Sequence, residues 1–176
     1  MEVNIKTYIQ TYPINEYVLV DVNRLDYVKN LYEHQYKTIR GAVYGAVSFT
    51  IDGQEIMMSS HNIDATWQSL TSYLLTKQFN YKQKFFLYVD DHDVKLINGC
   101  DKNNPQIRLK YNNSFTDWMS ISTFREALLT AFMDYMEIVN SADTETCIDE
   151  EGDSFEYPPE LKGVKENYQE LKNSFK

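Results

Sequence analysis

The sequence predicts an α+β fold in which helices pack mainly on one face of an antiparallel sheet of about five to seven strands. Three observations carry this prediction: strand-like runs come in adjacent pairs, helical patterns lie between and after them, and short turns join the pairs. A chain of 176 residues suits one domain with its own core. We therefore expect a single α+β domain over residues 1–140, an acidic segment over 141–160 and a short amphipathic helix over 161–176.

Two pairs of strands and one helix are predicted in the first part of the chain. Apolar side chains alternate over 3–9 and 17–21, which is the period of a half-buried strand. Apolar residues then recur at helical spacing over about 24–36, where a third strand is the alternative. The Asp52-Gly53 dipeptide is typical of a two-residue turn and predicts a hairpin over 43–59.

Helices and a meander are predicted in the second part. Asn62 or Asp64 can cap a helix whose apolar side faces the core. Three apolar runs over 85–111 predict a meander of antiparallel strands. Thr123 and Glu126 form a capping-box pattern and open the strongest helical pattern of the chain.

Negative charge is concentrated in one part of the chain. The formal net charge is −9 at pH 7, yet residues 1–140 hold 13 basic and 16 acidic side chains and are nearly neutral. Residues 141–160 alone contribute −8, and residues 161–176 return +2. A local block of negative charge attracts a basic partner and repels nucleic acid and anionic membranes. We therefore expect a basic protein partner and no direct binding to nucleic acid or membrane.

The acidic segment reads SADTETCIDEEGDSFEYPPE, with eight carboxylates and no lysine or arginine. Its composition supports a solvated linker to the last helix, because charge runs are usually solvated. Against this interpretation stand Ile148, Phe155 and Tyr157, apolar groups that a partner-binding element would carry. The candidates for electrostatic steering of a partner are Asp149, Glu150, Glu151, Asp153 and Glu156. The candidate anchors are Phe155 and Tyr157.

No recognised catalytic motif is present. The chain has no GxSxG elbow, no Walker loop and no GxGxxG, and neither Cys100 nor Cys147 has an activating context. We expect a protein that is not an enzyme and that has no cofactor. The alternative is an enzyme whose site is assembled by the fold from dispersed residues. Candidates for that site are Asp90, Asp91, His92 and His61.

Two stretches contain residue types that can bind a metal ion. The DDHD run at 90–93 has suitable ligand types, but adjacent residues in a tight turn point in different directions, which favours a hairpin loop. An EF-hand loop with Gly152 at its sixth position would begin at Cys147 and end at Pro158, where carboxylate ligands belong. We expect no metal ion, and a metal at DDHD stays the alternative.

The start of the chain, MEVNIKTYIQ, lacks the basic residues and the apolar run of a secretory signal. Nowhere do about 18 apolar residues follow one another, as a membrane-spanning helix requires. The two cysteines lie far apart in sequence and predict free thiols in a reducing compartment. We expect a cytoplasmic protein.

In layout, the chain resembles immunity proteins of bacterial polymorphic toxin systems. The resemblance covers about residues 40–140, with GAVSFTIDGQEI followed by IDATWQSLTSYL, in an acidic α+β chain without catalytic motifs. It implies a protein that binds a cognate toxin domain, often a basic nuclease, and blocks its active site. No functional residue transfers from it. The rival hypothesis from the same acidic segment is a phage antagonist whose carboxylates imitate nucleic-acid phosphates against a host defence nuclease.

Overall fold

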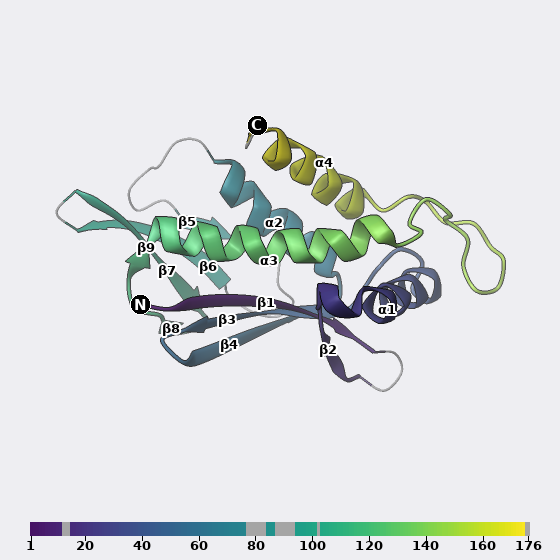
Figure 1. Cartoon of the computed structure of the whole chain (residues 1–176), viewed down its shortest axis with the longest axis horizontal. Coiled ribbons are helices and arrows are strands. Elements are labelled where there is room, and N and C mark those ends of the chain that lie inside the picture. The colour runs from purple at the N-terminus through teal and green to yellow at the C-terminus, as the bar shows by residue number, and fades with distance from the viewer. Residues whose placement is uncertain (12–14, 77–83, 87–93, 102, 175–176) are drawn as a thin grey trace.

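The computed structural model describes residues 1–176 apart from 12–14, 77–83, 87–93, 102 and 175–176 (Figure 1). The fold is α+β, and every described strand pair is antiparallel. The strands form two sheets, so the prediction of a single sheet is wrong. Local patterns identify hairpins, but they do not specify which distant strand edges join. Here the strands before residue 61 form one sheet, and the strands of the later meander form a second sheet.

The first sheet contains the strand pairs predicted near the start of the chain. Its strands in spatial order are β2 (Tyr17–Leu19), β1 (Val3–Gln10), β3 (Gly45–Ile51) and β4 (Gln54–Ser60). Alternation along β1 buries Ile5, Thr7 and Ile9. Asp52 and Gly53 both have positive φ, 47° and 83°, so the predicted two-residue turn is confirmed.

The second sheet contains the predicted meander. Its strands are β5 (Lys84–Phe86), β6 (Val94–Asp101), β7 (Asn104–Tyr111) and β8 (Ser114–Phe115), with β9 (Met119–Ser120) also paired to β7. One face of this sheet is apolar, because Leu96 on β6 lies opposite Leu109 on β7 and both are fully buried. The DDHD run at 90–93 lies outside the described residues.

Four α-helices and one short 3₁₀-helix complete the described part of the fold. They are η1 (Val22–Arg24), α1 (Leu25–Thr38), α2 (Ile63–Leu75), α3 (Ile121–Ser141) and α4 (Pro159–Ser174). The long helix α3 runs along β1 and also contacts the second sheet, so it is the common core element (Figure 1). The ring of Phe124 on α3 stacks on Phe49 of β3 at 6.1 Å.

Of the two helix starts for which the sequence predicts a cap, one agrees with the structure and one does not. Asn62 caps α2, because its side chain accepts a hydrogen bond from the Ala65 amide. The capping box predicted at Thr123 is wrong: α3 begins two residues earlier, directly after β9, with no side-chain cap at Ser120. Before α1, Asp21 accepts from the Asn23 amide at 2.9 Å and begins η1, which leads into the helix.

The C-terminal helix α4 packs against α2 of the same chain. Its apolar stripe of Leu161, Val164 and Leu171 is buried there. A Cβ added to Gly163 would lie 2.1 Å from Gln68 Nε2 on α2, so a glycine at this point lets the helices approach closely. The helix therefore belongs to the folded body.

Candidate functional site

Residues 147–156, which we call the acidic loop, form a compact hairpin-like turn. Ile148 and Ser154 pair in an isolated antiparallel bridge, and the Phe155 amide donates to the Cys147 carbonyl at 3.0 Å. Gly152 has a φ of 91°, a left-handed conformation that favours glycine, and its amide donates to the Asp149 carbonyl. These backbone hydrogen bonds between the two sides of the turn give a segment rich in carboxylates one defined shape.

Asp149 organises this turn. Its Oδ1 accepts hydrogen bonds from the backbone amides of Glu151 at 3.0 Å and Asp153 at 2.8 Å. An aspartate that accepts from amides two and four residues ahead stabilises a turn in the way a helix cap does. Only 11% of the Asp149 side chain is exposed. It therefore shapes the loop, and its charge is turned away from solvent.

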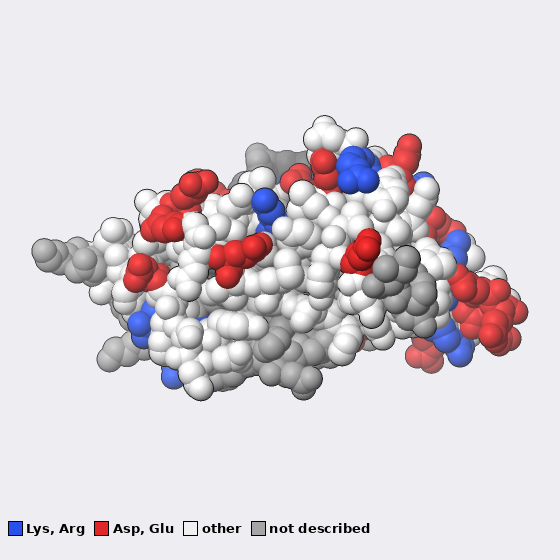
Figure 2. Space-filling view, turned by 90° about the horizontal axis from the view of Figure 1, so that it is seen from below, with Lys and Arg blue, Asp and Glu red and all other residues white. Residues whose placement is uncertain are grey.

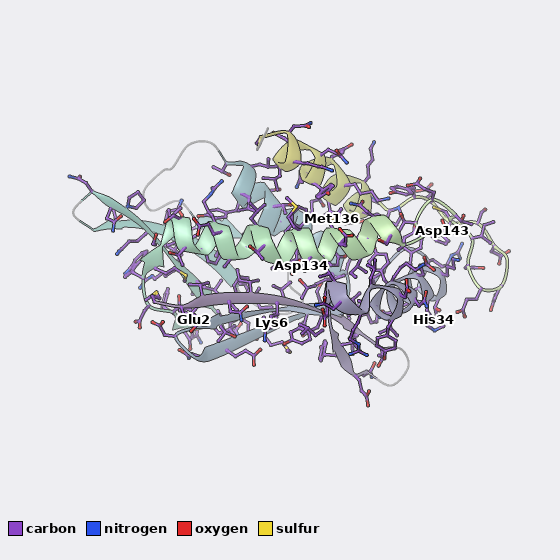
Figure 3. The ribbon with its side chains drawn as sticks, viewed as in Figure 1. Glu2, Lys6, His34, Asp134, Met136 and Asp143 are labelled. Carbon is purple, nitrogen blue, oxygen red and sulfur yellow. The ribbon has the colours of Figure 1, made fainter. Side chains whose placement is uncertain are left out.

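Side chains of α1, and Arg40 just after it, hold the acidic loop against the body. Arg40 donates from Nη2 to the Ser154 carbonyl at 2.9 Å, and its Nε lies 3.6 Å from Asp149 Oδ2. Glu150 Oε1 accepts from the Thr38 hydroxyl at 2.8 Å and lies 3.2 Å from His34 Nδ1. Figure 3 shows His34 at the end of the molecule where the loop lies.

Aromatic packing also holds the acidic loop against α1. The Phe155 ring meets the fully buried Tyr36 ring edge-on at 5.5 Å, and Tyr36 donates its hydroxyl to the Thr144 carbonyl at 2.8 Å. Gly41, with a φ of 98°, lies against Pro158 so closely that an added Cβ would be 2.4 Å from Pro158 Cγ. The candidate anchor Phe155 is thus half-buried in the body.

Lys165 ties the start of the segment to α4. Its Nζ donates to Thr144 Oγ1 at 2.7 Å and to Glu145 Oε1 at 3.1 Å, and it lies 5.6 Å from the centre of the Tyr157 ring. Burial alone would lower the pKa of Lys165, but the hydrogen bonds that it donates to Tyr157 and Glu145 raise it above its ordinary value. The second candidate anchor, Tyr157, therefore also packs within the fold.

The side chains left for a partner are three carboxylates and one apolar group. Glu151, Asp153 and Glu156 are exposed and form no ion pair with any described residue. Ile148, between the carboxylates, is 46% exposed. Figure 2 shows acidic side chains gathered at this end of the molecule, with a few basic ones among them.

The structure thus assigns different positions to the residues that the sequence singled out. Asp149, Glu150, Phe155 and Tyr157 contact the body, whereas Glu151, Asp153 and Glu156 face solvent. The supporting residues His34, Arg40 and Lys165 could not be identified from the sequence. His34 and Arg40 lie more than 100 positions before the acidic residues that they contact, and Lys165 lies 20 positions after Glu145. No local pattern signals such a contact.

A second polar group lies in the core. Asp64 on α2 accepts from Tyr135 at 2.5 Å and from Tyr32 at 2.9 Å, and all three side chains are buried. Burial raises the pKa of Asp64 to about 6, and the two tyrosine hydrogen bonds act against that rise. Perturbed carboxylates mark some active sites. This one is 1% exposed, so a substrate does not reach it in this conformation.

Dispersed catalytic or metal sites gain no support from the described residues. Asp90, Asp91 and His92 lie outside them, and His61 is exposed with its ring 5.0 Å from Tyr44. In the part of the chain that the structure describes, no three His, Cys, Asp or Glu side chains gather as a metal site. None of the helices described is long and apolar enough to cross a membrane.

Comparisons with family models, with curated proteins and with solved structures give no match to this chain. Its function therefore has to be inferred from its own residues.

Proposed function

We propose that this chain is a non-enzymatic inhibitory binding protein that captures a basic protein partner, such as a toxin nuclease, with its acidic loop. The observation that supports this proposal is a preorganised turn. Asp149 and its contacts on the body fix the backbone, and Glu151, Asp153 and Glu156 remain exposed. A loop that is already ordered loses less conformational entropy on binding than a flexible tail does.

The charge arrangement favours a basic partner. Within the acidic loop, Asp149 lies near Arg40 and Glu150 near His34. Glu151, Asp153 and Glu156 form no ion pair with any described residue. Unpaired surface charges of one sign speed the encounter with an oppositely charged surface. The loop lies at one end of the molecule, away from the sheets (Figure 1). In that position it can enter the concave, basic cleft in which a nuclease holds phosphates.

Ile148 takes the role that the sequence analysis gave to Phe155 and Tyr157. Both rings hold the loop in place, whereas the Ile148 side chain is 46% exposed next to the carboxylates. Apolar groups at the centre of an interface usually carry more binding energy than the charged rim. We therefore assign steering to the three carboxylates and anchoring to Ile148.

The test is capture of partners from the native host by the tagged chain at low and then high salt. The variant Glu151→Gln/Asp153→Asn/Glu156→Gln removes the exposed charges and keeps the turn. The matched control, Glu55→Gln/Glu126→Gln/Glu137→Gln, removes three exposed charges elsewhere on the surface. We expect one basic protein to be retained by the wild type and the control and to be reduced with the loop variant.

The captured protein is then identified and its own activity measured with and without this chain. Inhibition by the wild type at equimolar concentration supports the proposal. Equal capture by both triple variants, an acidic partner, or unchanged partner activity would each overturn it.

A further inference from the structure

The outer face of the second sheet carries positive charge on an otherwise acidic protein. Lys95 on β6 lies directly opposite Lys110 on β7, and Lys84 on β5 lies opposite Ile97 on β6. Arg108 on β7 lies opposite the same Ile97, so the four basic residues occupy neighbouring positions on three strands. Their alternation with buried Leu96 and Leu109 places them on the face away from the core. Lys95 and Lys110 thus place two basic side chains next to each other on this face.

Two aromatic rings lie beside these charges. The Arg108 guanidinium carbon is 4.2 Å from the centre of the Phe115 ring and 4.5 Å from that of Trp118. The rings are 49% and 38% exposed. Among the described residues, Arg108 Nε is buried without a hydrogen-bond partner, and no carboxylate pairs with this side chain. Stacking therefore positions Arg108, and the rings keep area that is open to a ligand.

Trp118 packs against β6 at Gly99. A Cβ added to Gly99 on β6 would lie 2.6 Å from Trp118 Cη2, so only a glycine lets the indole lie across this strand. The ring contacts both Gly99 and the Arg108 guanidinium, and these contacts restrict its rotation. A fixed, half-exposed indole is the kind of platform on which a nucleobase stacks.

These residues line one hollow of about 780 Å³. Among the described residues that line it, four are Lys or Arg, two are aromatic, and none is Asp or Glu. That volume lies within the range of sites that hold drug-sized ligands. An open sheet face with aromatic platforms and adjacent positive charge is also how several protein modules hold unpaired bases.

We propose that this face binds single-stranded nucleic acid. Lys84, Lys95 and Lys110 would contact phosphates, while bases stack on Trp118 and Phe115. Arg108 already stacks on both rings, but 49% of Phe115 and 38% of Trp118 stay exposed. An acidic peptide would match the charge without using this flat apolar area, so the rings favour a strand with bases. The net charge of −9 does not oppose this, because the acidic loop lies at the other end of the molecule (Figure 1). Surface charges further apart than about 8 Å are screened at physiological salt.

The test is fluorescence anisotropy of a labelled 12-nucleotide oligo(dT) with the full chain at 50 and 200 mM salt. We expect saturable binding that weakens with salt. Lys95→Gln/Lys110→Gln should weaken it at least about tenfold and reduce the salt dependence, since two phosphate contacts are lost. Trp118→Leu should weaken it at least about fivefold through lost stacking. The control Lys162→Gln/Lys172→Gln, which changes two exposed lysines on α4, should bind like the wild type.

Thiol protection gives a second readout of the same site. Cys100 is exposed and lines the hollow, while Cys147 lies half-buried beside Tyr36 in the acidic loop. Bound oligo(dT) should slow the modification of Cys100 by a neutral maleimide and leave Cys147 unchanged. An unchanged rate at Cys147 also shows that the acidic loop keeps its packing on Tyr36 in each variant.

Four results would overturn the proposal: no binding at 50 mM salt, duplex binding as tight as single-strand binding, oligonucleotide binding unaffected by both variants, or an unprotected Cys100. A polyglutamate peptide of equal charge can be added as a competitor. If it displaces oligo(dT), and if its own binding also depends on Trp118, the face is assigned to an acidic protein instead. None of these results bears on the acidic loop, so the two proposals stand or fall separately.

Discussion

The hydroxyl of Tyr135 on α3 donates a hydrogen bond of 2.5 Å to Asp64 on α2, and both side chains are buried. Tyr32 on α1 donates to the other carboxylate oxygen at 2.9 Å, so one carboxylate joins three helices. A buried charge is costly unless it is hydrogen-bonded. These two hydrogen bonds offset part of that cost. Removing the hydroxyl of Tyr32 or of Tyr135 should therefore lower the free energy of unfolding.

The first prediction concerns pH. Burial raises the pKa of Asp64 from 3.8 to about 6 in the folded state. A raised pKa means that this group contributes its full stability below about pH 4 and loses that contribution as pH rises through about 6. The difference corresponds to about 3 kcal/mol. The variant Asp64→Asn lacks this titration, so its stability relative to the wild type should increase by about that amount between pH 4 and pH 7.

Urea unfolding of both proteins at several pH values measures this difference. Other carboxylates titrate in both proteins and cancel in the comparison, with the exception of Glu160, whose charge acts on Asp64 and leaves a small remainder. Asp134, whose pKa burial also raises, provides a control: it is exposed, and Asp134→Asn should change the profile far less. A stability difference between wild type and Asp64→Asn that stays constant with pH would contradict the prediction.

The second prediction concerns the tyrosines. Asp64→Ala leaves the buried hydroxyls of Tyr32 and Tyr135 without their acceptor, and each unsatisfied group costs about 1–3 kcal/mol. Tyr135→Phe removes one donor but leaves Tyr32 bonded, so it should cost less than Asp64→Ala. Thermal unfolding at pH 7 ranks the two variants. The reverse order would mean that the hydroxyls find other partners.

The third prediction concerns the close approach of β1 and β3. A Cβ added at Gly45 would lie 2.3 Å from the Tyr8 carbonyl oxygen, which is backbone and cannot turn away. Gly45→Ala should therefore destabilise the sheet by about 2–3 kcal/mol, the upper part of the range for overpacked cores. Gly53→Ala changes a glycine with open space around it and should cost only about 1 kcal/mol, through its positive φ. Equal losses by urea unfolding would show that β1 and β3 can separate locally.

The fourth prediction concerns the turn of the acidic loop. Asp149→Ala removes the acceptor for the Glu151 and Asp153 amides, and the lost hydrogen bonds should cost about 1 kcal/mol. Hydrogen exchange at these two amides should become several times faster. Asp153→Ala removes an exposed carboxylate with no such role and should leave exchange at Glu151 unchanged. Equal rates in both variants would mean that other contacts fix the turn.

Much of the fold could be predicted from the sequence, because its elements are specified locally. The alternation over β1, the Asp52-Gly53 turn and the apolar stripe of α3 each depend on residues that are close to one another in sequence. The division into two sheets, and the docking of α4 on α2, depend on contacts between distant segments. Periodicity shows which face of an element is apolar, but not which partner covers it.

The candidate site shows the same limit more sharply. Composition located the acidic segment, yet it did not separate Glu151, which faces solvent, from Asp149, which holds the turn. That difference depends on Arg40, more than 100 positions away. The basic face of the second sheet was missed for a related reason. Its lysines are spread over three strands, and their charge is diluted in the whole-chain average.

The last prediction links the body to the acidic loop through Gly41. This residue has a φ of 98° and lies against Pro158 and Phe155, so Gly41→Ala adds both backbone strain and a Cβ within 2.4 Å of Pro158 Cγ. The loop should detach from α1, with faster hydrogen exchange across 141–158. Gly152→Ala adds comparable strain, at a φ of 91°, but has no neighbour within 4 Å. It should therefore speed exchange only near the turn itself.

Binding measurements with these two variants distinguish shape from charge, because neither variant alters a charged residue. If the partner requires the loop in its docked position, Gly41→Ala should weaken capture at least about tenfold, and Gly152→Ala should weaken it less. Binding would have to order the released residues again, and the entropic cost is about 1–2 kcal/mol per residue before new contacts offset it. The variant that releases more residues should therefore bind more weakly. Unchanged capture by Gly41→Ala, together with fast exchange over 141–158, would show that the partner needs only the carboxylates and orders the loop itself.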